Sequence, residues 1–488
     1  MSMIKIENLT FSYPGSYDPV FEQINFQIDT DWKLGLIGRN GRGKTTFLKL
    51  LQKKYEYSGT IVSSVSFDYF PYPVNDPAQW TREVLQEVCP QAEEWELLRE
   101  FSCLEVDPDV LWRPFQTLSN GEQTKVLLAA LFLNPGRFLL IDEPTNHLDR
   151  AARELVSQYL RRKKGFVLVS HDRHFLDGCV DHILSFNRTN IEVQSGNFSS
   201  WMENFTRQQE FEQAQHDRLQ GEVKRLQQAA RRAASWSART EASKIGTGAY
   251  DRGFIGHKAA KMMKRSKAVE ARREQAAEEK AGLLKNVETA EELKLFPLSD
   301  HRDRFVTFSD VVVRYGERTV CGPVSFTLRR GERVVLEGKN GSGKSSLLKL
   351  LLGQPVPHTG EVTTASGLVI SYVPQNTGHL RGSLADFAAE HNLDESLFKT
   401  ILRKMDFERV QFEKNLEDLS SGQRKKVLLA RSLCERAHVY VWDEPLNFID
   451  IYSRMQVEQL LCRFAPAMIF VEHDRVFQET VATKVLSL

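Results

Sequence analysis

The stretch GRNGRGKTT, residues 38–46, decides how this chain folds. It follows the apolar segment KLGLI and precedes the apolar helical pattern FLKLL, so it joins a buried strand to a helix. Its glycines let backbone N–H groups surround phosphate oxygens at a helix N-terminus, where negative charge is favoured. The spacing G-x-x-x-x-G-K-[ST] predicts a phosphate-binding loop in which Lys44 reaches the outer phosphates and Thr45 holds magnesium.

The same arrangement occurs a second time, about 300 residues further along the chain. There RVVLE leads into GKNGSGKSS, residues 338–346, and LLKLL follows. Because five landmarks match in the same order, the chain contains two copies of one α/β nucleotide-binding unit. The matched pairs are Gly38 and Gly338, Lys44 and Lys344, Ser119 and Ser420, Asp142 and Asp443, and His171 and His473.

Both copies carry two carboxylates directly after a buried strand, in FLLIDEP and in VYVWDEP. Asp142 and Asp443 are placed to orient magnesium through its water shell. Glu143 and Glu444, one residue further on, can polarise an attacking water as general bases. Acidic pairs after a strand are otherwise often solvated ends, so this interpretation depends on the phosphate loops upstream.

Between the phosphate loop and the carboxylates, each copy has a serine-glycine turn that opens an amphipathic helix. The two turns read LSNGEQTKVLLAA from residue 118 and LSSGQRKKVLLA from residue 419. By itself such a turn is a helix cap. Here the sequence resembles the L-S-G-G-Q signature of ATP-binding cassette proteins. The resemblance implies that two cassettes pair head to tail, so that the signature of one closes over the ATP held by the other.

The resemblance therefore implies two composite sites that bind ATP with Mg2+ and hydrolyse it. Site one would combine residues 38–46 with the second signature, and site two would combine residues 338–346 with the first. His171 and His473, at the ends of VLVSHD and IFVEHD, would be switch histidines that contact the terminal phosphate and act with the two glutamates. The nucleotide-binding residues that follow are Tyr13, Gly38, Asn40, Gly41, Gly43, Lys44, Thr45, Thr46, Ser119, Asn120, Gly121, Glu122, Tyr315, Gly338, Asn340, Gly341, Gly343, Lys344, Ser345, Ser346, Gln375, Ser420, Ser421, Gly422 and Gln423.

Three further matches to the cassette family complete this expectation. Tyr13 and Tyr315 lie about two dozen residues before the phosphate loops, where the family stacks an aromatic ring on adenine; a core aromatic is the alternative for each. Asp149 and Asp450 occupy the loop that crosses the dimer seam. The magnesium ligands would be Thr45, Asp142, Ser345, Gln375 and Asp443.

The two halves differ at the family's magnesium-contacting glutamine. The second half has Gln375 in YVPQ, whereas the first has Tyr72 in YFPY. Because a phenol lacks the geometry of an amide, we expect slower hydrolysis at site one. The second half also reads DEPLNFID where the first reads DEPTNHLD. Both halves keep the glutamate and the histidine, so both sites are expected to be active.

The segment between the two copies changes in composition. From about residue 198 to 243 it is charged and helix-forming, with apolar residues at steps of three and four, and seven-residue steps continue after residue 262. This spacing predicts an antiparallel α-helical hairpin with its tip at about 244–257. A helix of about 45 residues rises roughly 67 Å, so the tip should project away from the cassettes. The predicted domains are a first cassette at 1–197, the linker at 198–298 and a second cassette at 299–488.

The linker is also basic, with fifteen Lys and Arg against six Asp and Glu in residues 216–275. A solvated strut is the ordinary interpretation of such a charge run. Here the excess has one sign, it lines up along helices, and the tip adds Tyr250 and Phe254 among glycines. Cations along a rigid prong with aromatics at its end suit a phosphate-lined cleft, which favours structured RNA as the partner.

Two cassettes in one chain with a basic helical hairpin between them resemble the F branch of ATP-binding cassette proteins, which act on ribosomes. The resemblance covers essentially the whole chain. It implies that the linker enters the tRNA exit (E) site of the 70S ribosome, contacts 23S rRNA and P-site tRNA, and points its tip at the peptidyl transferase centre. ATP binding would fix that pose and hydrolysis would release it. The protein would be a monomer with an intramolecular cassette dimer.

GRNGRGKT, LSNGEQTKVLLAALFLNP and GFIGHKAAKMMKRSKA further resemble the Lsa-type antibiotic-resistance members of that branch. That subgroup protects ribosomes against lincosamides, pleuromutilins and streptogramin A. The resemblance makes Lys244, Tyr250 and Phe254 the candidates for the tip that acts near the drug site. Short spacing from residue 72 to 119 leaves no room for the arm that many housekeeping members insert there.

The bulk properties fit a cytoplasmic protein, and the resemblance implies that it associates with ribosomes. The chain has 488 residues, 41% of them hydrophobic, a formal net charge of +1 and no apolar run near the roughly 18 residues that a membrane span needs. Its six cysteines show no metal-ligand spacing, which argues against a zinc-bearing DNA-repair ATPase. Two alternatives remain: a housekeeping translation factor of the F branch, and the detached ATPase subunit of an exporter.

Overall fold

The computed structural model describes residues 2–15, 19–187, 190–212 and 292–488, together with single residues between 214 and 268. The chain forms two compact units. The first contains residues 1–187, 191–199 and 290–488, and the second contains residues 188–190 and 200–289. The predicted linker tip, with Lys244, Tyr250 and Phe254, lies outside the described residues.

The first cassette is built on a six-stranded sheet with the order β5-β6-β7-β3-β8-β9. All neighbouring strands pair in parallel except β8 and β9. The central strands are short apolar runs that are almost fully buried, as expected for a parallel sheet covered on both faces. The strands are β3 (Lys33–Gly38), β5 (Ser66–Phe70), β6 (Arg137–Asp142), β7 (Phe166–Val169), β8 (His182–Phe186) and β9 (Ile191–Ser195).

A second, antiparallel sheet with the order β2-β1-β4 joins this core. It contains β1 (Met3–Phe11), β2 (Phe21–Asp29) and β4 (Ser58–Val62). The phosphate-loop helix α1 (Lys44–Leu51) buries its apolar side chains in one cluster with residues of both sheets, among them Ile4 and Leu36. The helix is therefore fixed by packing along its length, and its N-terminus stays free for the loop.

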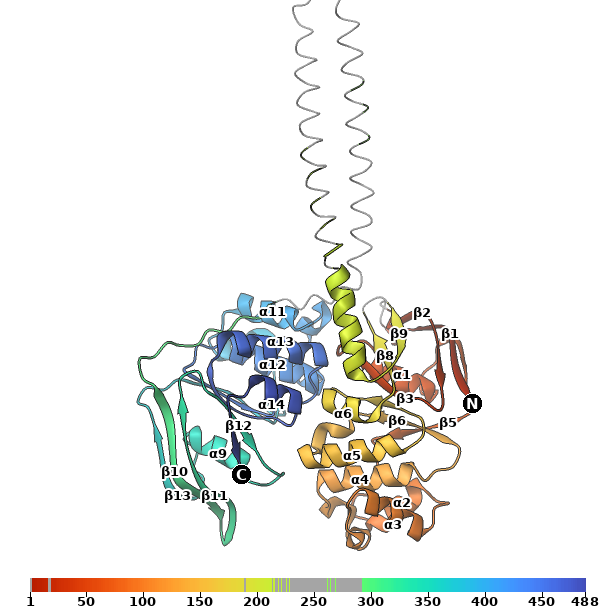
Figure 1. Cartoon of the computed structure of the whole chain (residues 1–488), viewed down its shortest axis with the longest axis horizontal. Coiled ribbons are helices and arrows are strands. Elements are labelled where there is room, and N and C mark those ends of the chain that lie inside the picture. Colours follow the sequence, from red (N-terminus) through yellow and green to blue (C-terminus); the bar gives the residue numbers. More distant parts are fainter. Residues whose placement is uncertain are drawn as a thin grey trace, which may run out of the picture. The chain divides into compact units, whose positions relative to one another are not determined.

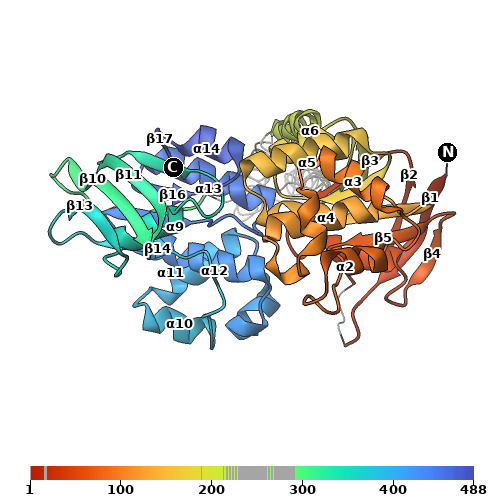
Figure 2. The ribbon, with the colours of Figure 1, turned by 90° about the horizontal axis from the view of Figure 1, so that it is seen from below.

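The remaining helices of the first cassette follow the strands (Figures 1 and 2). Helix α4 begins with a capping box, because the Ser119 side chain accepts from the backbone N–H of Glu122 while Glu122 accepts from the backbone N–H of Ser119. The elements are α2 (Thr81–Val88), α3 (Glu94–Cys103), η1 (Pro108–Trp112), η2 (Phe115–Thr117), α4 (Asn120–Leu131), η3 (Pro144–His147), α5 (Arg150–Arg162) and α6 (Arg173–Cys179).

The second cassette repeats this plan, drawn in green to blue in Figure 1. Its sheets have the orders β14-β15-β16-β12-β17 and β11-β10-β13. Its elements are β10 (Arg304–Tyr315), β11 (Arg318–Arg329), β12 (Arg333–Glu337), α9 (Lys344–Leu351), β13 (His358–Thr364), β14 (Ile370–Val373), α10 (Leu384–Glu390), α11 (Glu395–Lys404), η4 (Arg409–Glu413), η5 (Leu416–Asp418), α12 (Ser421–Cys434), β15 (Val439–Asp443), α13 (Ile451–Phe464), β16 (Ala467–Val471), α14 (Arg475–Val481) and β17 (Lys484–Ser487). The predicted pair of α/β cassettes is thus confirmed.

The ends of the predicted linker can be seen in part. In the second unit residues 200–212 are helical, and Trp201 stacks on Phe205 with ring centroids 5.0 Å apart. At the other end, residues 292–298 belong to the body of the second cassette, because Leu293 and Leu295 are buried in its helical core. The backbone N–H of Leu298 also donates to the carbonyl of Ala437 at 2.8 Å. The predicted domain boundaries stay predictions, as does the hairpin between them.

The packing of Leu295 generates a stability prediction. Leu295→Ala should lower the free energy of unfolding of the second cassette by about 2–5 kcal/mol, because it leaves a cavity at a site that is 2% exposed. Lys294→Ala is the matched control, since Lys294 is exposed. Urea denaturation of both variants checks this, and equal midpoints would show that the segment is not part of the cassette core.

Candidate functional site

The predicted catalytic side chains converge because of sheet topology. In the first cassette β5, β6, β7 and β3 are neighbours and run in parallel. Their carboxyl ends carry Tyr72, Asp142, His171 and the phosphate loop, respectively. Ligands of open α/β sheets bind at this edge. The chain order of these segments is scattered, yet parallel pairing brings them to one place.

The first phosphate loop has the shape that its glycines predict. Gly43 has a φ of 86° and stands directly before α1. A Cβ added there would lie 2.6 Å from Val20 Cγ1, so only glycine fits. The Lys44 ammonium donates to the carbonyls of Gly38 at 2.7 Å and Arg39 at 3.1 Å. Burial lowers the pKa of Lys44, and the loop carbonyls hold its ammonium over the loop.

Thr45 and Asp142, two of the predicted magnesium ligands, lie side by side. The Thr45 hydroxyl donates to Asp142 Oδ2 at 2.9 Å, and the Tyr69 hydroxyl donates to the same oxygen at 2.9 Å. Burial and the nearby Asp142 raise the pKa of Tyr69. Sequence reasoning missed Tyr69. The internal repeat could have revealed it, because Tyr372 stands at the corresponding position of the second cassette, on the strand next to the one that ends in Asp443. Burial and Asp443 raise the pKa of Tyr372 to about 12.

Glu143 and His171 face one another, with Glu143 Oε1 3.3 Å from His171 Nε2. Glu143 has a φ of 51°, a left-handed conformation that is uncommon for non-glycine residues. Burial and Asp142 raise the pKa of Glu143 to about 8. Burial and the positive charge of Lys44 lower the pKa of His171 well below its usual value, so its ring is neutral.

The second cassette repeats this arrangement with different contacts at the glutamate. Glu444 also has a positive φ, of 47°, and its Oε1 lies 3.6 Å from His473 Nε2. The Asn447 amide donates to Glu444 Oε2 at 2.6 Å. Burial raises the pKa of Glu444, but the neighbouring His473 and the hydrogen bonds with Gln375 and Asn447 outweigh it and lower the pKa to about 2. Gln375 thus reaches the carboxylate next to Asp443, from the position that Tyr72 occupies in the first cassette.

The second phosphate loop matches the first. The Lys344 ammonium donates to the carbonyls of Gly338 at 2.7 Å and Lys339 at 2.9 Å, and burial lowers its pKa. Gly343 has a φ of 89°. Burial raises the pKa of Asp443. A hydrogen bond with Ser345 lowers it, but by less than burial raises it.

The two predicted adenine-stacking tyrosines lie beside the phosphate loops and not in the core. Tyr13 is 39% exposed and its hydroxyl is 2.7 Å from Thr46 Oγ1. Tyr315 is 46% exposed and its hydroxyl is 3.2 Å from Ser346 Oγ. A ring at this position can cover a base whose phosphates enter the loop. Neither tyrosine is a buried core aromatic, which was the alternative interpretation.

The residues present fit a magnesium nucleotide at both sites. Asp443 Oδ1, Glu143 Oε1, His171 Nδ1 and His473 Nε2 are buried without a hydrogen-bond partner. Buried polar atoms of this kind need a partner, and a bound ligand can supply it. A Cβ added to Gly341 would meet no atom within 4 Å, so the second loop is open to a ligand. Within the described part of the chain, no cluster of three or more His, Cys, Asp and Glu forms a metal site by itself.

The first phosphate loop contacts the second cassette directly. The Asn40 amide donates to the carbonyl of Phe448 at 2.7 Å. A Cβ added to Gly422, in the second signature, would lie 2.9 Å from Asn40 Nδ2. Arg39 is 5% exposed and lies over the ring of Tyr452 at 5.3 Å. We call this set of contacts seam one; it brings the first loop and the second signature together.

The second phosphate loop and the first signature instead line a cavity of about 910 Å3. Across it, the backbone N–H of Asn340 donates to Asp149 Oδ2 at 3.4 Å. We call this side seam two. The predicted site residues in the cavity wall are Ser119, Asn120, Gly121, Glu122, Asn340, Gly341, Gly343, Lys344, Ser345, Ser346, Gln375, Glu444 and His473.

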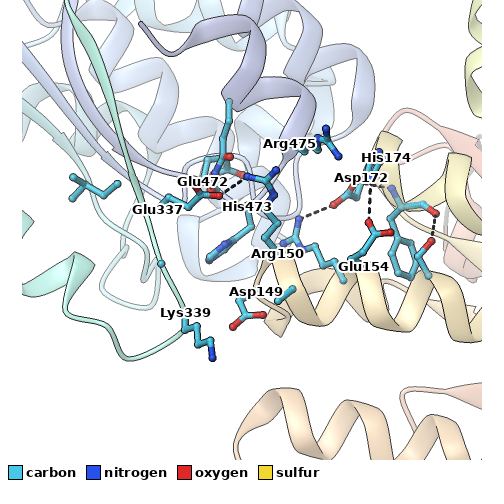
Figure 3. Close-up of a pocket in the computed structure, with 17 residues that line it drawn as sticks. Asp149, Arg150, Glu154, Asp172, His174, Glu337, Lys339, Glu472, His473 and Arg475 are labelled. Carbon is cyan, nitrogen blue, oxygen red and sulfur yellow. Dashed lines mark hydrogen bonds and ion pairs between the residues drawn. The ribbon is translucent and has the colours of Figure 1, made fainter. Parts of the chain in front are cut away.

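A further cavity of about 450 Å3 lies along seam two (Figure 3). Its walls come from α5 and α6 on one side and from β12 and α14 on the other. An ion pair between Arg150 and Glu337 spans it. Glu337 immediately precedes the second phosphate loop, so this partly exposed pair connects the start of α5 to the loop.

Seam one is closed at the position that corresponds to this cavity. Arg173, on α6, forms a two-point ion pair with Glu458 on α13 and lies 3.7 Å from Asp474 Oδ1. The side chains of Arg173 and Glu458 are 10% and 8% exposed. At the corresponding position of seam two, Arg475 is 45% exposed and pairs with Glu479 of its own helix. The two seams therefore differ in both packing and charge pairing.

A protein with two such cassettes, each with a phosphate loop, a signature turn and a carboxylate pair, is a tandem-cassette nucleotide-binding protein. The sequence pattern described as ABC transporter matches residues 21–146 and 321–447. The chain belongs to the ABC-F family of ATP-binding cassette proteins, and its domains are those of an ATPase. Among the described residues no helix is long and apolar enough to cross a membrane.

Two curated relatives and two solved structures illustrate the likeness. The ribosome protection protein VmlR of Bacillus subtilis is 30% identical over 98% of this chain and 85% of its own length. The energy-dependent translational throttle protein EttA of Haemophilus influenzae is 26% identical over 96% of this chain and 88% of its own. The structure titled RNase-L Inhibitor has a TM-score of 0.65 at 19% identity, over 99% of this chain and 87% of that one. An archaeal ribosome recycling factor, solved with a ribosomal stalk protein, has a TM-score of 0.63 at 19% identity, over 96% of this chain and 84% of that one. These two structures show the fold alone.

The buried ion pair of seam one generates a prediction. Arg173→Ala should lower the free energy of unfolding by about 3–5 kcal/mol, because Glu458 is left buried without its cation. Replacing both residues by apolar ones, as in Arg173→Met with Glu458→Leu, should recover most of that loss. Urea denaturation of the full chain checks this.

Arg475→Ala is the matched control for this experiment. It removes the corresponding but exposed cation of seam two and should leave the unfolding transition unchanged. If Arg173→Ala behaved like Arg475→Ala, the difference between the seams would have no energetic consequence.

Proposed function

We propose that this chain hydrolyses ATP at two composite sites and uses the cycle to act on ribosomes. The cavity of seam two carries this proposal, because residues of the second phosphate loop and the first signature line it together with Glu444 and His473. Site one is supported by the contacts of Asn40 with Phe448 and of Gly422 with the first loop. The site residues predicted from the sequence are proposed in the same roles here.

In this proposal the backbone of each loop binds the phosphates and the loop lysine contacts the outer ones. Glu444 accepts the proton of the attacking water, and its low pKa keeps it ionised at neutral pH. His473 stands next to it, with its Nε2 3.6 Å from Glu444 Oε1, and orients the terminal phosphate. Mg2+, held by Ser345, Asp443 and Gln375, would neutralise phosphate charge when bound.

The first site would use Glu143, His171, Thr45 and Asp142 in the same roles, but Glu143 is mostly protonated at neutral pH because its pKa is raised to about 8. At the second site the Gln375 amide donates a hydrogen bond to Glu444. The first site has Tyr72 at the corresponding position, so Glu143 has no such amide donor. We therefore propose slower hydrolysis at site one. Seam one is the more closely packed of the two, which suits a site that retains its nucleotide longer.

The proposed partner is the 70S ribosome. The names of the relatives support it: one is a ribosome protection protein and the other a translational throttle. The basic composition of residues 216–275 supports RNA as the surface that the linker contacts. We propose that the linker enters the tRNA exit site, contacts 23S rRNA and P-site tRNA, and that the protein acts in the cytoplasm as a monomer with paired cassettes.

Within this function we propose protection of the peptidyl transferase centre against lincosamides, pleuromutilins and streptogramin A. The similarity to VmlR and the Lsa-type motifs favour it. A housekeeping translation factor is the second candidate, because the similarity to EttA covers nearly the same share of the chain. An exporter ATPase would fractionate with membranes instead of ribosomes.

The double variant Glu143→Gln with Glu444→Gln tests the catalytic roles. Each general base is worth about two to four orders of magnitude in rate, so the variant should bind ATP and accumulate on ribosomes. ATP hydrolysis and co-sedimentation with 70S ribosomes measure this. The drug tolerance of a susceptible Gram-positive host, measured with wild type and variant, tests protection. We expect the wild type to raise drug tolerance selectively for the three drug classes and the variant to abolish this rise.

Two outcomes would contradict parts of this proposal. Normal turnover by the double variant would remove both glutamates from the roles given to them. No rise in tolerance for any drug, from a protein that still sediments with ribosomes, would favour the housekeeping factor. Macrolides and phenicols serve as the control drugs.

Substitution of Phe254 tests the proposed role of the linker tip. Phe254→Ala should leave ATP hydrolysis and ribosome binding nearly unchanged but reduce drug tolerance, because the aromatic ring is removed from the proposed contact near the drug site. Phe254→Tyr, which keeps a ring, is the matched control. Minimum inhibitory concentrations measure the effect, and unchanged protection by Phe254→Ala would overturn the role of the tip.

A further inference from the structure

Three tryptophans of the first cassette are about half exposed. Trp80, Trp95 and Trp112 have exposed fractions of 49%, 56% and 55%. They lie at the start of α2, in the first turn of α3 and at the end of η1. Large aromatic side chains gathered on one small part of a surface are a mark of an interaction site.

Side-chain contacts connect two of these tryptophans to each other. The guanidinium of Arg82 lies 5.1 Å from the ring centroid of Trp112, and its Nη2 lies 3.2 Å from Glu94 Oε2. Glu94 is the chain neighbour of Trp95, whose ring carries the Arg99 guanidinium at 5.6 Å. The three elements therefore form one continuous surface, in which cations already lie over two of the rings.

Trp80 joins the same surface through the backbone. It forms an antiparallel bridge with Pro114, two residues after Trp112. The next residue, Thr81, donates its backbone N–H to the carbonyl of Arg113 at 2.9 Å. Helices α2 and α3 both pack against α4, which lies between them in Figure 2. We call the three tryptophans and the exposed carboxylates of the same elements, Glu83, Glu87, Glu93, Glu94 and Asp109, the tryptophan surface.

The second cassette shows that the fold does not need these rings. The N-cap of α10 is Ser383, where α2 has Trp80. The second residue of α11 is Ser396, where α3 has Trp95, and η4 ends in Glu413, where η1 ends in Trp112. Both helical segments form the same elements around apolar cores. The tryptophans therefore serve something other than the stability of this part of the cassette.

The charge of the surrounding segment defines the partner. Residues 76–117 contain ten Asp and Glu but only three Lys and Arg. The corresponding residues 379–418 of the second cassette contain nine Asp and Glu and six Lys and Arg. Most of these acidic side chains are exposed. They are Asp76, Glu83, Glu87, Glu93, Glu94, Glu105, Asp107 and Asp109, of which Glu105 and Asp107 line the cavity of seam two and do not belong to the tryptophan surface.

We propose that the tryptophan surface docks a Lys- and Arg-rich segment of a partner protein. Cationic side chains lie well over indole rings, and their apolar stems cover the remaining ring surface. The carboxylates around the rings attract such a segment and set its register. An RNA backbone or a second copy of the acidic surface would be repelled. The inference does not depend on the proposed action on ribosomes.

Binding of a defined peptide tests the proposal. The probe is a labelled 20-residue peptide of alternating lysine and glycine, and fluorescence anisotropy gives its Kd at physiological salt. The variant Trp80→Ser, Trp95→Ser, Trp112→Glu carries the residues of the second cassette and should weaken binding about tenfold. It also adds a negative charge, so attraction by charge alone predicts equal or tighter binding. The variant Glu83→Gln, Glu87→Gln, Asp109→Asn should weaken binding and reduce its salt dependence.

Val410→Ser is the matched control, because Val410 is an exposed apolar residue at the corresponding part of the second cassette and should leave the Kd unchanged. Unchanged ATP hydrolysis by each variant reports intact folding. Three results would each overturn the proposal: an unchanged Kd for the tryptophan variant, preferential binding of a 20-nucleotide single-stranded RNA that this variant loses, or a wild-type dimer in sedimentation that the variant dissociates.

Discussion

The phosphate loops are the constraint on which the rest of this structure depends. Each one must turn from a buried strand into a helix within a few residues, and Gly43 and Gly343 make the turn in a left-handed conformation that a Cβ would prevent. The turn brings the ammonium group of the loop lysine back over carbonyls of its own loop. The helix then packs between two sheets, so the position of the loop is fixed by the core of the cassette.

Parallel pairing extends this constraint to the catalytic groups. Strands β6 and β15 deliver their carboxylates to the edge that the loop occupies, and the strand ends before His171 and His473 lie beside them. The two glutamates nevertheless differ in environment. Burial and a neighbouring carboxylate raise the pKa of Glu143, whereas hydrogen bonds overcome burial at Glu444 and lower its pKa. The same backbone plan thus supports two chemically different sites.

The two seams extend the difference to the contact between the cassettes. Seam one buries an arginine-carboxylate pair, whereas seam two has an exposed ion pair and open cavities. Exposed pairs are screened by solvent, so the ion pair of seam two contributes little to the contact between the cassettes. Outside the seams, the helical segment of the first cassette presents tryptophans where the second has polar residues. A duplicated fold has thereby acquired two distinct halves.

The sequence by itself determined the two α/β cassettes, their phosphate loops, and the candidate carboxylates and histidines, because these features are local patterns that recur at a fixed offset. It also exposed the replacement of an amide by Tyr72. It could not show that Tyr69 shares Asp142 with Thr45, that Leu293 and Leu295 pack in the second cassette, or that the seams differ. Burial, pKa and contact across a seam arise between residues hundreds of positions apart. Only the tertiary structure decides which of them meet.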